Sequence, residues 1–349
     1  MRCLLAVDSG GTKCQTIAVK EDGSLVGWGR GGFPDSTDCA HVHHGSGRSA
    51  ESVNSAIMQA LRGVECSELH VVGYHRWALD AVLGSGFQGE VVHHPVPEHD
   101  GILQLVGLEF GLIASAGTGA FVHVVAQDGS HLHLDSLGPI LGDHGSAYHI
   151  GMLAVQAAAK CDWHPRHETS LKEVVHEALS LTADRGRGTS LIGVFDRVKD
   201  RAAIADLARL VDEEARGSEH HERPEHPELV EGRSGRGDAV ANAILDEAAS
   251  SLAQTVYDAY DSLQMSGLDY CLVGTGGVIE SSDIYWGHLC EHVREFAPDL
   301  RFARTDLPHV VGTALSALHN IANGDLDGAR ERLISSAREV FRSNKEFPK

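Results

Sequence analysis

The sequence predicts an α/β protein with two similar halves, each built on a mixed β-sheet with flanking helices. Residues 3–30 and 112–136 both resemble three consecutive strands, because apolar positions alternate and short polar turns separate them. The turn Glu21-Asp22-Gly23-Ser24 in the first stretch is echoed by Gln127-Asp128-Gly129-Ser130 in the second. Segments with helical spacing and single buried strands follow each stretch. A repeat of this kind indicates a duplicated supersecondary unit.

The first half continues with alternating helices and strands. We expect a helix over 48–63, a strand over 69–73, a short helix over 78–83, a strand over 90–94 and a helix over 98–108. A helix precedes each added strand, so these strands should join the sheet in parallel. The predicted unit is a mixed five-stranded sheet.

The second half has the same plan with an insertion. After its three strands we expect a helix over 146–160, short helices over 168–215, a polar, proline-broken loop over 220–237, a long helix over 238–265, a strand over 270–273, helices over 280–296 and 309–321, and a last charged helix over 326–349. The predicted domains are residues 1–109 and 110–325, the second with a helical insertion at about 160–237.

Composition limits the classes of function. The 349 residues carry a net charge of −20, which disfavours nucleic acid or an anionic membrane as the main partner. No apolar run approaches the roughly 20 residues of a membrane helix, and no secretory signal is visible. The seven cysteines stand singly, which favours reduced thiols and a cytoplasmic location. We interpret the histidine pairs around residues 41–44 and 131–133 as surface histidines.

The stretch from Leu4 to Lys13 is the first candidate ligand site. A buried strand ends in Asp8, then Gly10, Gly11, Thr12 and Lys13, and a second strand follows directly. The bend therefore lacks the following helix of the Walker and Rossmann phosphate loops. Adjacent glycines let backbone N–H groups approach a phosphate, and Asp8 could hold magnesium through water. The alternative is a glycine-rich hairpin bend without a ligand.

Three further glycine-rich stretches repeat this logic at strand ends. They are Ala116-Gly117-Thr118-Gly119, Leu137-Gly138-Pro139-Ile140-Leu141-Gly142-Asp143-His144-Gly145-Ser146 and Val273-Gly274-Thr275-Gly276-Gly277. With Asp-Ser-Gly-Gly-Thr-Lys at the start and Tyr148-His149-Ile150-Gly151 after Ser146, the chain resembles the sugar-kinase, Hsp70 and actin superfamily. Within it, the chain is most similar to the N-acetylglucosamine kinase branch and the BadF-type ATPases.

The resemblance implies two ribonuclease-H-like, actin-like ATPase domains that face each other across a nucleotide and sugar cleft. It implies an ATP- and magnesium-dependent sugar kinase, for which we expect a homodimer, and a last helix that packs back on the first domain. The turns at Gly10-Gly11 and Gly117-Gly119 would hold the phosphates from opposite domains. The glycines 274, 276 and 277 would leave a flat surface for adenine and ribose.

Asp100 is the candidate catalytic base. It begins a helix after the strand at 90–94, where the family has Asn-Asp and this chain has His99-Asp100. A carboxylate there could accept the proton of a sugar hydroxyl. The alternative is an acidic residue favoured by the helix dipole.

The Gly138 to Asp143 segment and the loop at Asp35-Ser36 would contact the sugar. Asp143 matches a family carboxylate that binds sugar hydroxyls, although Asp is also a common N-cap. Three family features are replaced: the loop Asn by Asp35, a Ser-Asn pair by Ala120-Phe121, and a Trp by Leu137. A carboxylate would suit a free amine or hydroxyl better than an acetamide. The alternative for Asp35 is a solvated loop residue.

Two other functions remain open. BadF-type activators hold an iron–sulfur cluster through a closely spaced cysteine pair, and this chain has no such pair. A non-catalytic sugar or nucleotide sensor is the third hypothesis; the presence of Asp8, Asp100 and Asp143 argues against it.

Overall fold

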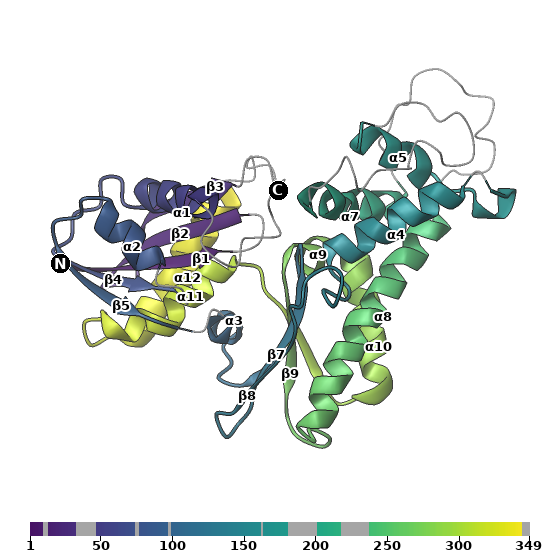
Figure 1. Ribbon diagram of the computed structural model, residues 1–349. Coiled ribbons are helices and arrows are strands. Elements are labelled where there is room, and N and C mark those ends of the chain that lie inside the picture. Colours follow the sequence, from purple (N-terminus) through teal and green to yellow (C-terminus); the bar gives the residue numbers. More distant parts are fainter. Residues whose placement is uncertain are drawn as a thin grey trace.

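The computed structural model describes residues 1–9, 13–32, 47–73, 77–96, 99–161, 163–180, 201–217 and 237–343. Two five-stranded mixed sheets form the centres of its two halves (Figure 1). The strand order is β3-β2-β1-β4-β5 in the first sheet and β10-β9-β6-β7-β8 in the second. Each sheet has three antiparallel strands in sequence, with parallel strands added on the other side, as the repeated pattern predicted.

The first sheet is formed by β1 (Arg2–Ser9), β2 (Lys13–Lys20), β3 (Leu25–Gly32), β4 (Glu68–Val72) and β5 (Glu90–His94). Successive side chains of a strand point to opposite sides of the sheet. The central strand β1 is buried on both faces, because helices cover both sides. Leu5 and Val7 pack with α1 (Gly47–Ala60) and α2 (Trp77–Gly84). Leu4 and Ala6 pack on the other face with α11 (His309–Ala317) and α12 (Leu326–Ser343).

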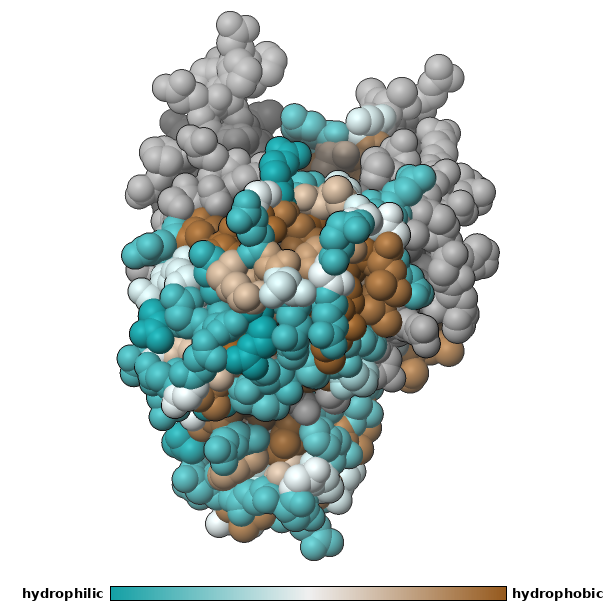
Figure 2. All heavy atoms as spheres, turned by 90° about the vertical axis from the view of Figure 1, so that its left-hand side faces the viewer, coloured by the Kyte–Doolittle hydropathy of each residue, from teal (hydrophilic) through white to brown (hydrophobic). Residues whose placement is uncertain are grey.

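The last third of the chain thus returns to the first sheet. Val310, Val311 and Ala314 of α11, together with Leu333 and Ala337 of α12, lie in the same apolar cluster as Leu4. Residues 307–321, which the sequence prediction assigned to the second domain, contribute to this core. The outer face of this half is mainly hydrophilic, with apolar residues gathered across its upper part (Figure 2).

The second sheet is formed by β6 (Gly111–Ala116), β7 (Ala120–Val125), β8 (His131–Asp135), β9 (Cys271–Thr275) and β10 (Arg301–Arg304). The strand β10 was not expected from the sequence. It is a four-residue edge strand with exposed arginines at both ends, so it lacks the apolar run of a buried strand.

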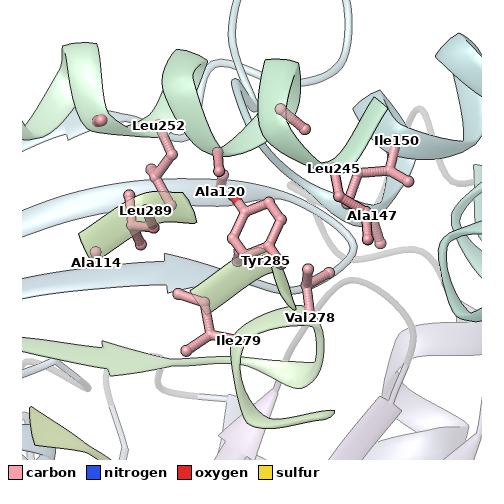
Figure 3. Close-up of a cluster of buried hydrophobic side chains, with 14 of the residues drawn as sticks. Ala114, Ala120, Ala147, Ile150, Leu245, Leu252, Val278, Ile279, Tyr285 and Leu289 are labelled. Atoms are coloured by element: carbon pink, nitrogen blue, oxygen red, sulfur yellow. The ribbon is translucent and has the colours of Figure 1, made fainter. Parts of the chain in front are cut away.

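Helices on one side of the second sheet enclose the largest apolar cluster. They include α4 (Ala147–Lys160), α5 (Leu171–Ala178), α7 (Arg201–Arg216), α8 (Ala239–Ser262), α9 (Gly277–Ser281) and α10 (Asp283–Phe296), with a short 3₁₀ turn at Pro165–His167. A second 3₁₀ turn, Leu318–Asn320, follows α11 and packs in the first half. The fully buried ring of Tyr285 lies at the centre of this cluster, between β7, α8 and α9 (Figure 3).

Helix α3 (Asp100–Leu105) lies between the two sheets (Figure 1). Its Ile102 and Leu103 pack on Ile113 and Val273 of the second sheet. Its backbone also touches α11, because a Cβ added to Gly101 would lie 2.1 Å from the carbonyl oxygen of Gly312. Two helices can approach this closely only where both lack a side chain. The crossing of α3 and α11 therefore joins the two halves.

Several elements end differently from the prediction. Helix α3 stops at Leu105 because Gly107 adopts φ +75°, whereas the helix was expected to reach residue 108. The helix expected over 280–296 is two helices, since Ser282 is extended and caps α10. Residues 201–216 form one helix rather than short ones. In the described part of the chain, none of the helices is both long and apolar enough to span a membrane.

Candidate active site

Part of the predicted site lies outside the described residues. This holds for Gly10, Gly11, Thr12, Asp35 and Ser36 and for the histidines near residue 41. For Lys13 and Asp100 only the backbone is described: Lys13 begins β2, and Asp100 begins α3 between the two sheets.

Asp8 lies near the carboxyl end of β1, the central strand of the first sheet, and it is half-buried. Its cross-strand neighbour is Gln15 of β2. Asp8 is therefore at the end of β1 that leads to the first glycine pair. Among the described residues, no group of three or more histidine, cysteine or acidic side chains has the arrangement of a metal site.

The second glycine turn, Gly117 to Gly119, joins β6 to β7. The Gly117 N–H donates to the Gly119 carbonyl at 2.9 Å. The Gly117 carbonyl accepts from the N–H of Ala147 at 2.8 Å, which connects the turn to the first residue of α4. Ser146 caps that helix, because its hydroxyl accepts from the His149 N–H at 3.1 Å. The turn is therefore fixed to the first turn of α4.

Asp143 lies against this turn but is enclosed. It is only 4% exposed, and its backbone has φ +55°. Its Oδ1 accepts from the Ala120 N–H at 3.1 Å, and its Oδ2 accepts from Nη2 of Arg201. Burial raises the pKa of Asp143, while Arg201 and the Ala120 N–H oppose that rise. In this arrangement the hydrogen bonds of the carboxylate go to the Ala120 N–H and to Arg201.

Asp135, which the sequence reasoning missed, holds the loop that contains Asp143. Its carboxylate accepts from the backbone N–H groups of Asp143 at 2.6 Å and His144 at 3.0 Å. Burial would raise the pKa of Asp135, but these hydrogen bonds hold it below its usual value. A Cβ on Gly142 would lie 2.1 Å from Oδ1 of Asp135, which explains that glycine. An Asp at the end of a strand and before a glycine-rich loop was the available signal.

Gly145 is held from the opposite side by Tyr285. The Tyr285 hydroxyl donates to the Gly145 carbonyl at 2.7 Å, and burial raises the pKa of this tyrosine. A Cβ on Gly145, which has φ +80°, would lie 2.7 Å from the tyrosine oxygen. The loop from Asp143 to Gly145 thus rests on the core shown in Figure 3.

The third glycine motif has mixed roles. A Cβ on Gly274 would lie 2.4 Å from the ring of Trp286, so this glycine makes room for packing. A Cβ on Gly276 would lie 2.5 Å from the Ala116 carbonyl, and this residue has φ +91°. Only Gly277 has open space at its Cβ position. We therefore assign Gly274 to packing and keep Gly276 and Gly277 as nucleotide candidates.

A hydrogen-bond network connects this motif to α11. The Thr275 hydroxyl lies 2.6 Å from Nε2 of His309, the first residue of α11, and it accepts from the Thr305 hydroxyl at 2.9 Å. The Gly276 N–H donates to Glu280 at 3.0 Å. His309 and Glu280 were not predicted, because nothing in the local sequence relates them to Thr275.

His99 lies just before α3, and its ring packs on the second sheet. Its ring stacks on His133 with centroids 5.1 Å apart and lies 4.4 Å from Phe121. Ala120, by contrast, belongs to the core around Tyr285. Leu137 is exposed, and Gly138, with φ +82°, begins the loop without a contact at its Cβ position. The structure thus brings Gly119, Ala120 and Asp143 together, whereas Phe121 faces α3.

A surface hollow of about 300 Å³ lies elsewhere, lined by Met1, Lys20, Glu21, Asp22, Asn323, Asp325 and Arg332. It is at the opposite end of β1 from Asp8, so it is remote from the glycine turns.

Comparisons with known proteins agree with this fold. No protein-family model matches the chain. The N-acetyl-D-glucosamine kinase of Dictyostelium discoideum is 25% identical over 351 residues, which are 90% of this chain and 98% of that protein. The N-acetylmuramic acid/N-acetylglucosamine kinase of Clostridium acetobutylicum is 26% identical over 62% of each chain.

Two solved structures, both proposed to be N-acetylglucosamine kinases, share the fold. The protein from Chromobacterium violaceum has a TM-score of 0.56 at 22% identity and covers 90% of this chain and 98% of its own. The protein from Porphyromonas gingivalis has a TM-score of 0.58 at 15% identity and covers 92% of this chain and 99% of its own. With its duplicated sheets, the chain has the fold of these two structures, and its sequence is similar to that of an N-acetyl-D-glucosamine kinase.

Proposed function

We propose that this protein is an ATP-dependent kinase that transfers the γ-phosphoryl group to a hydroxyl of an amino sugar, a hexose or a related small polyol. The main support is the similarity to an N-acetyl-D-glucosamine kinase along 90% of the chain. Glycine-rich sequences directly follow the strands β1, β6 and β9, as a phosphate- and nucleotide-binding role requires.

Phosphoryl transfer depends mainly on positioning and charge. The Gly10 to Thr12 and Gly117 to Gly119 turns would bind phosphate oxygens through backbone N–H groups. Asp8 fits a magnesium site, because a half-buried carboxylate beside a phosphate turn matches the few protein ligands that magnesium usually takes. Bound magnesium would neutralise charge on the phosphates.

Asp100 is the proposed general base. As first residue of α3 it lies on the element between the two sheets, and the packing of Ile102, Leu103 and Gly101 fixes that element. A carboxylate there would accept the proton of the acceptor hydroxyl late in a loose transition state.

The test is ADP release, coupled to a spectrophotometric readout, with ATP and magnesium against glucose, glucosamine, N-acetylglucosamine, N-acetylmuramic acid and small polyols. We expect acceptor-dependent ADP release and a phosphorylated product by mass spectrometry. The control is the same assay without an acceptor. ADP release that no acceptor stimulates would argue for an ATPase activator, and sugar binding without turnover would argue for a sensor.

We also propose a magnesium-dependent, cytoplasmic homodimer that acts on small molecules rather than on nucleic acid or membranes. The net charge of −20 argues against nucleic acid or anionic membranes as partners, and the six free cysteines among the described residues fit a reducing compartment. Sedimentation equilibrium tests the oligomeric state.

A further inference from the structure

Arg201 lies at the second glycine turn, although it belongs to the inserted helix α7. A Cβ placed on Gly119 would be 3.0 Å from Nη2 of Arg201 and 2.6 Å from Oδ1 of Asp143. The guanidinium and the carboxylate therefore lie directly against the last residue of the turn. This contact could not be predicted from the sequence, because α4 and α5 separate the turn from α7 in the chain.

Asp143 is better placed to hold Arg201 than to bind a ligand. Both of its oxygens already accept hydrogen bonds, one from the Ala120 N–H and one from Arg201. A buried carboxylate is expensive without a partner, so the pair keeps Asp143 where it is. The Ala120 N–H also ties the pair to the first residue of β7.

Arg201, unlike Asp143, still has hydrogen-bonding groups for a ligand. Its side chain is 26% exposed, and Asp143 accepts from Nη2, while Nε is buried without a hydrogen-bond partner. A guanidinium has five N–H donors, so donors remain for another anion. Its planar fork suits phosphate oxygens.

The helix that carries Arg201 is fixed at both ends. One turn after Arg201, the backbones of α7 and α4 touch, since a Cβ on Gly151 would lie 1.9 Å from the Ile204 carbonyl oxygen. Near its other end, Asp212 accepts from the Ser282 hydroxyl and pairs with Arg216 at 2.7 Å. Arg201 is thus held in place before any ligand binds, which lowers the cost of binding.

We propose that Arg201 binds a phosphate oxygen of the nucleotide at the Gly117–Gly119 turn, and that Asp143 is the residue that positions it. The inference rests on the proposed kinase function. A nucleotide brings several negative charges to a chain of net charge −20, so a fixed local cation contributes directly to its affinity.

The test compares ADP and adenosine binding by calorimetry, with magnesium and without an acceptor. Arg201→Met should weaken ADP binding roughly ten- to hundredfold, the effect of a charged hydrogen bond, and leave adenosine binding unchanged. Arg201→Lys should give a smaller loss, because it keeps the charge without the fork. The matched control is Arg209→Met on the same helix, which removes an exposed pair with Glu213 and should change neither affinity.

The role of Asp143 has its own readout. Asp143→Asn should weaken ADP binding less than Arg201→Met does. The double variant should bind ADP no more weakly than Arg201→Met alone, because Asp143 would act through Arg201. Additive losses would overturn the positioning role.

Unchanged ADP affinity in Arg201→Met, or equal losses for ADP and adenosine, would overturn the proposal. A change confined to the KM of the acceptor would also overturn it, because Arg201 would then contact the acceptor and not the nucleotide. If Arg201→Met does not fold, the ADP affinity of Arg201→Lys tests the proposal in its place. Wild-type protein that binds no ADP would overturn the kinase function as well, whereas a working kinase indifferent to Arg201 would overturn this inference alone.

Discussion

At the scale of single residues, the candidate site combines groups found by motif with groups found only by contact. Asp8 and Asp100 follow from strand-end and helix-start patterns, and both lie where those patterns placed their backbones. Asp135, Tyr285 and Arg201 do not belong to any motif. They hold Asp143 and Gly145 in place, so they fix the loop that lies against the second turn.

Asp100→Asn tests the proposed base. The amide keeps the size of the side chain but cannot take a proton, so kcat should fall by about two to four decades with little change in ATP affinity. Steady-state kinetics and nucleotide titration measure the two effects. Near-normal turnover in a folded variant would remove Asp100 from the mechanism.

The substrate preference tests Asp35. A charged carboxylate in place of the family's Asn should favour a free amine or an added hydroxyl over an acetamide, and such a hydrogen bond is worth roughly 1.5–3 kcal/mol. We expect glucosamine to be used better than N-acetylglucosamine, and Asp35→Asn to reduce that preference while leaving the KM for ATP unchanged. If N-acetylglucosamine is the best acceptor, Asp35 does not occupy the position of the Asn in the related kinases.

At the scale of elements, helices α3 and α11 form the contact between the two halves. Each packs on a different sheet, and their backbones meet at Gly101 and Gly312. Helix α11 is also hydrogen-bonded to the third glycine motif, because His309 at its start contacts Thr275. A change at the crossing should therefore affect stability more than a change at an open glycine.

Gly312→Ala tests the crossing. Its Cβ would lie 2.6 Å from the Gly101 carbonyl oxygen, and overpacking of this kind costs typically about 1–3 kcal/mol of unfolding free energy. Urea unfolding measures the loss. Gly84→Ala, at the end of α2 with no atom near its Cβ position, should change stability by less than roughly 0.5 kcal/mol. Equal effects in the two variants would show that the helices do not touch as described.

Two partly buried histidines should make stability depend on pH. Burial lowers the pKa of His94, which lies 2.8 Å from His70, and of His149, which accepts the Gly145 N–H at 3.1 Å. Both stay neutral in the folded chain at pH values where the unfolded chain binds protons. The unfolding free energy should therefore fall as the pH drops below about 6.5.

Denaturant unfolding at pH 8, 7, 6 and 5 measures that slope. The combined change His94→Gln and His149→Gln should flatten it, since neither amide titrates. A wild-type slope that survives both substitutions would assign the dependence to other groups.

At the scale of the whole molecule, helices from the end of the chain cover one face of the first sheet. We propose a first domain of residues 1–109 together with 307–343, and a second of about 110–305. The core of Leu4, Val310 and Leu333 supports this division. The chain then crosses between the domains near α3 and again before α11.

Ligand-induced closure follows from that division. If phosphate turns on both sheets bind one nucleotide, ATP and acceptor together should draw the domains closer and exclude water from the γ-phosphate. Small-angle scattering should show a smaller radius of gyration with a non-hydrolysable ATP analogue and sugar than without ligands. Identical radii would argue against closure.

By itself the sequence determined the strands other than β10, their duplicated pattern and the glycine motifs that follow them, because each depends on periodicity and turn chemistry within a few residues. It could not place Arg201 at Gly119, α11 on the first sheet, or Trp286 in the space left by Gly274. These contacts join segments far apart in the chain, and side-chain periodicity records which face of an element is buried but not what covers it. Only tertiary packing decided which charged group reached the second turn, since that depended on how α7 rests on α4.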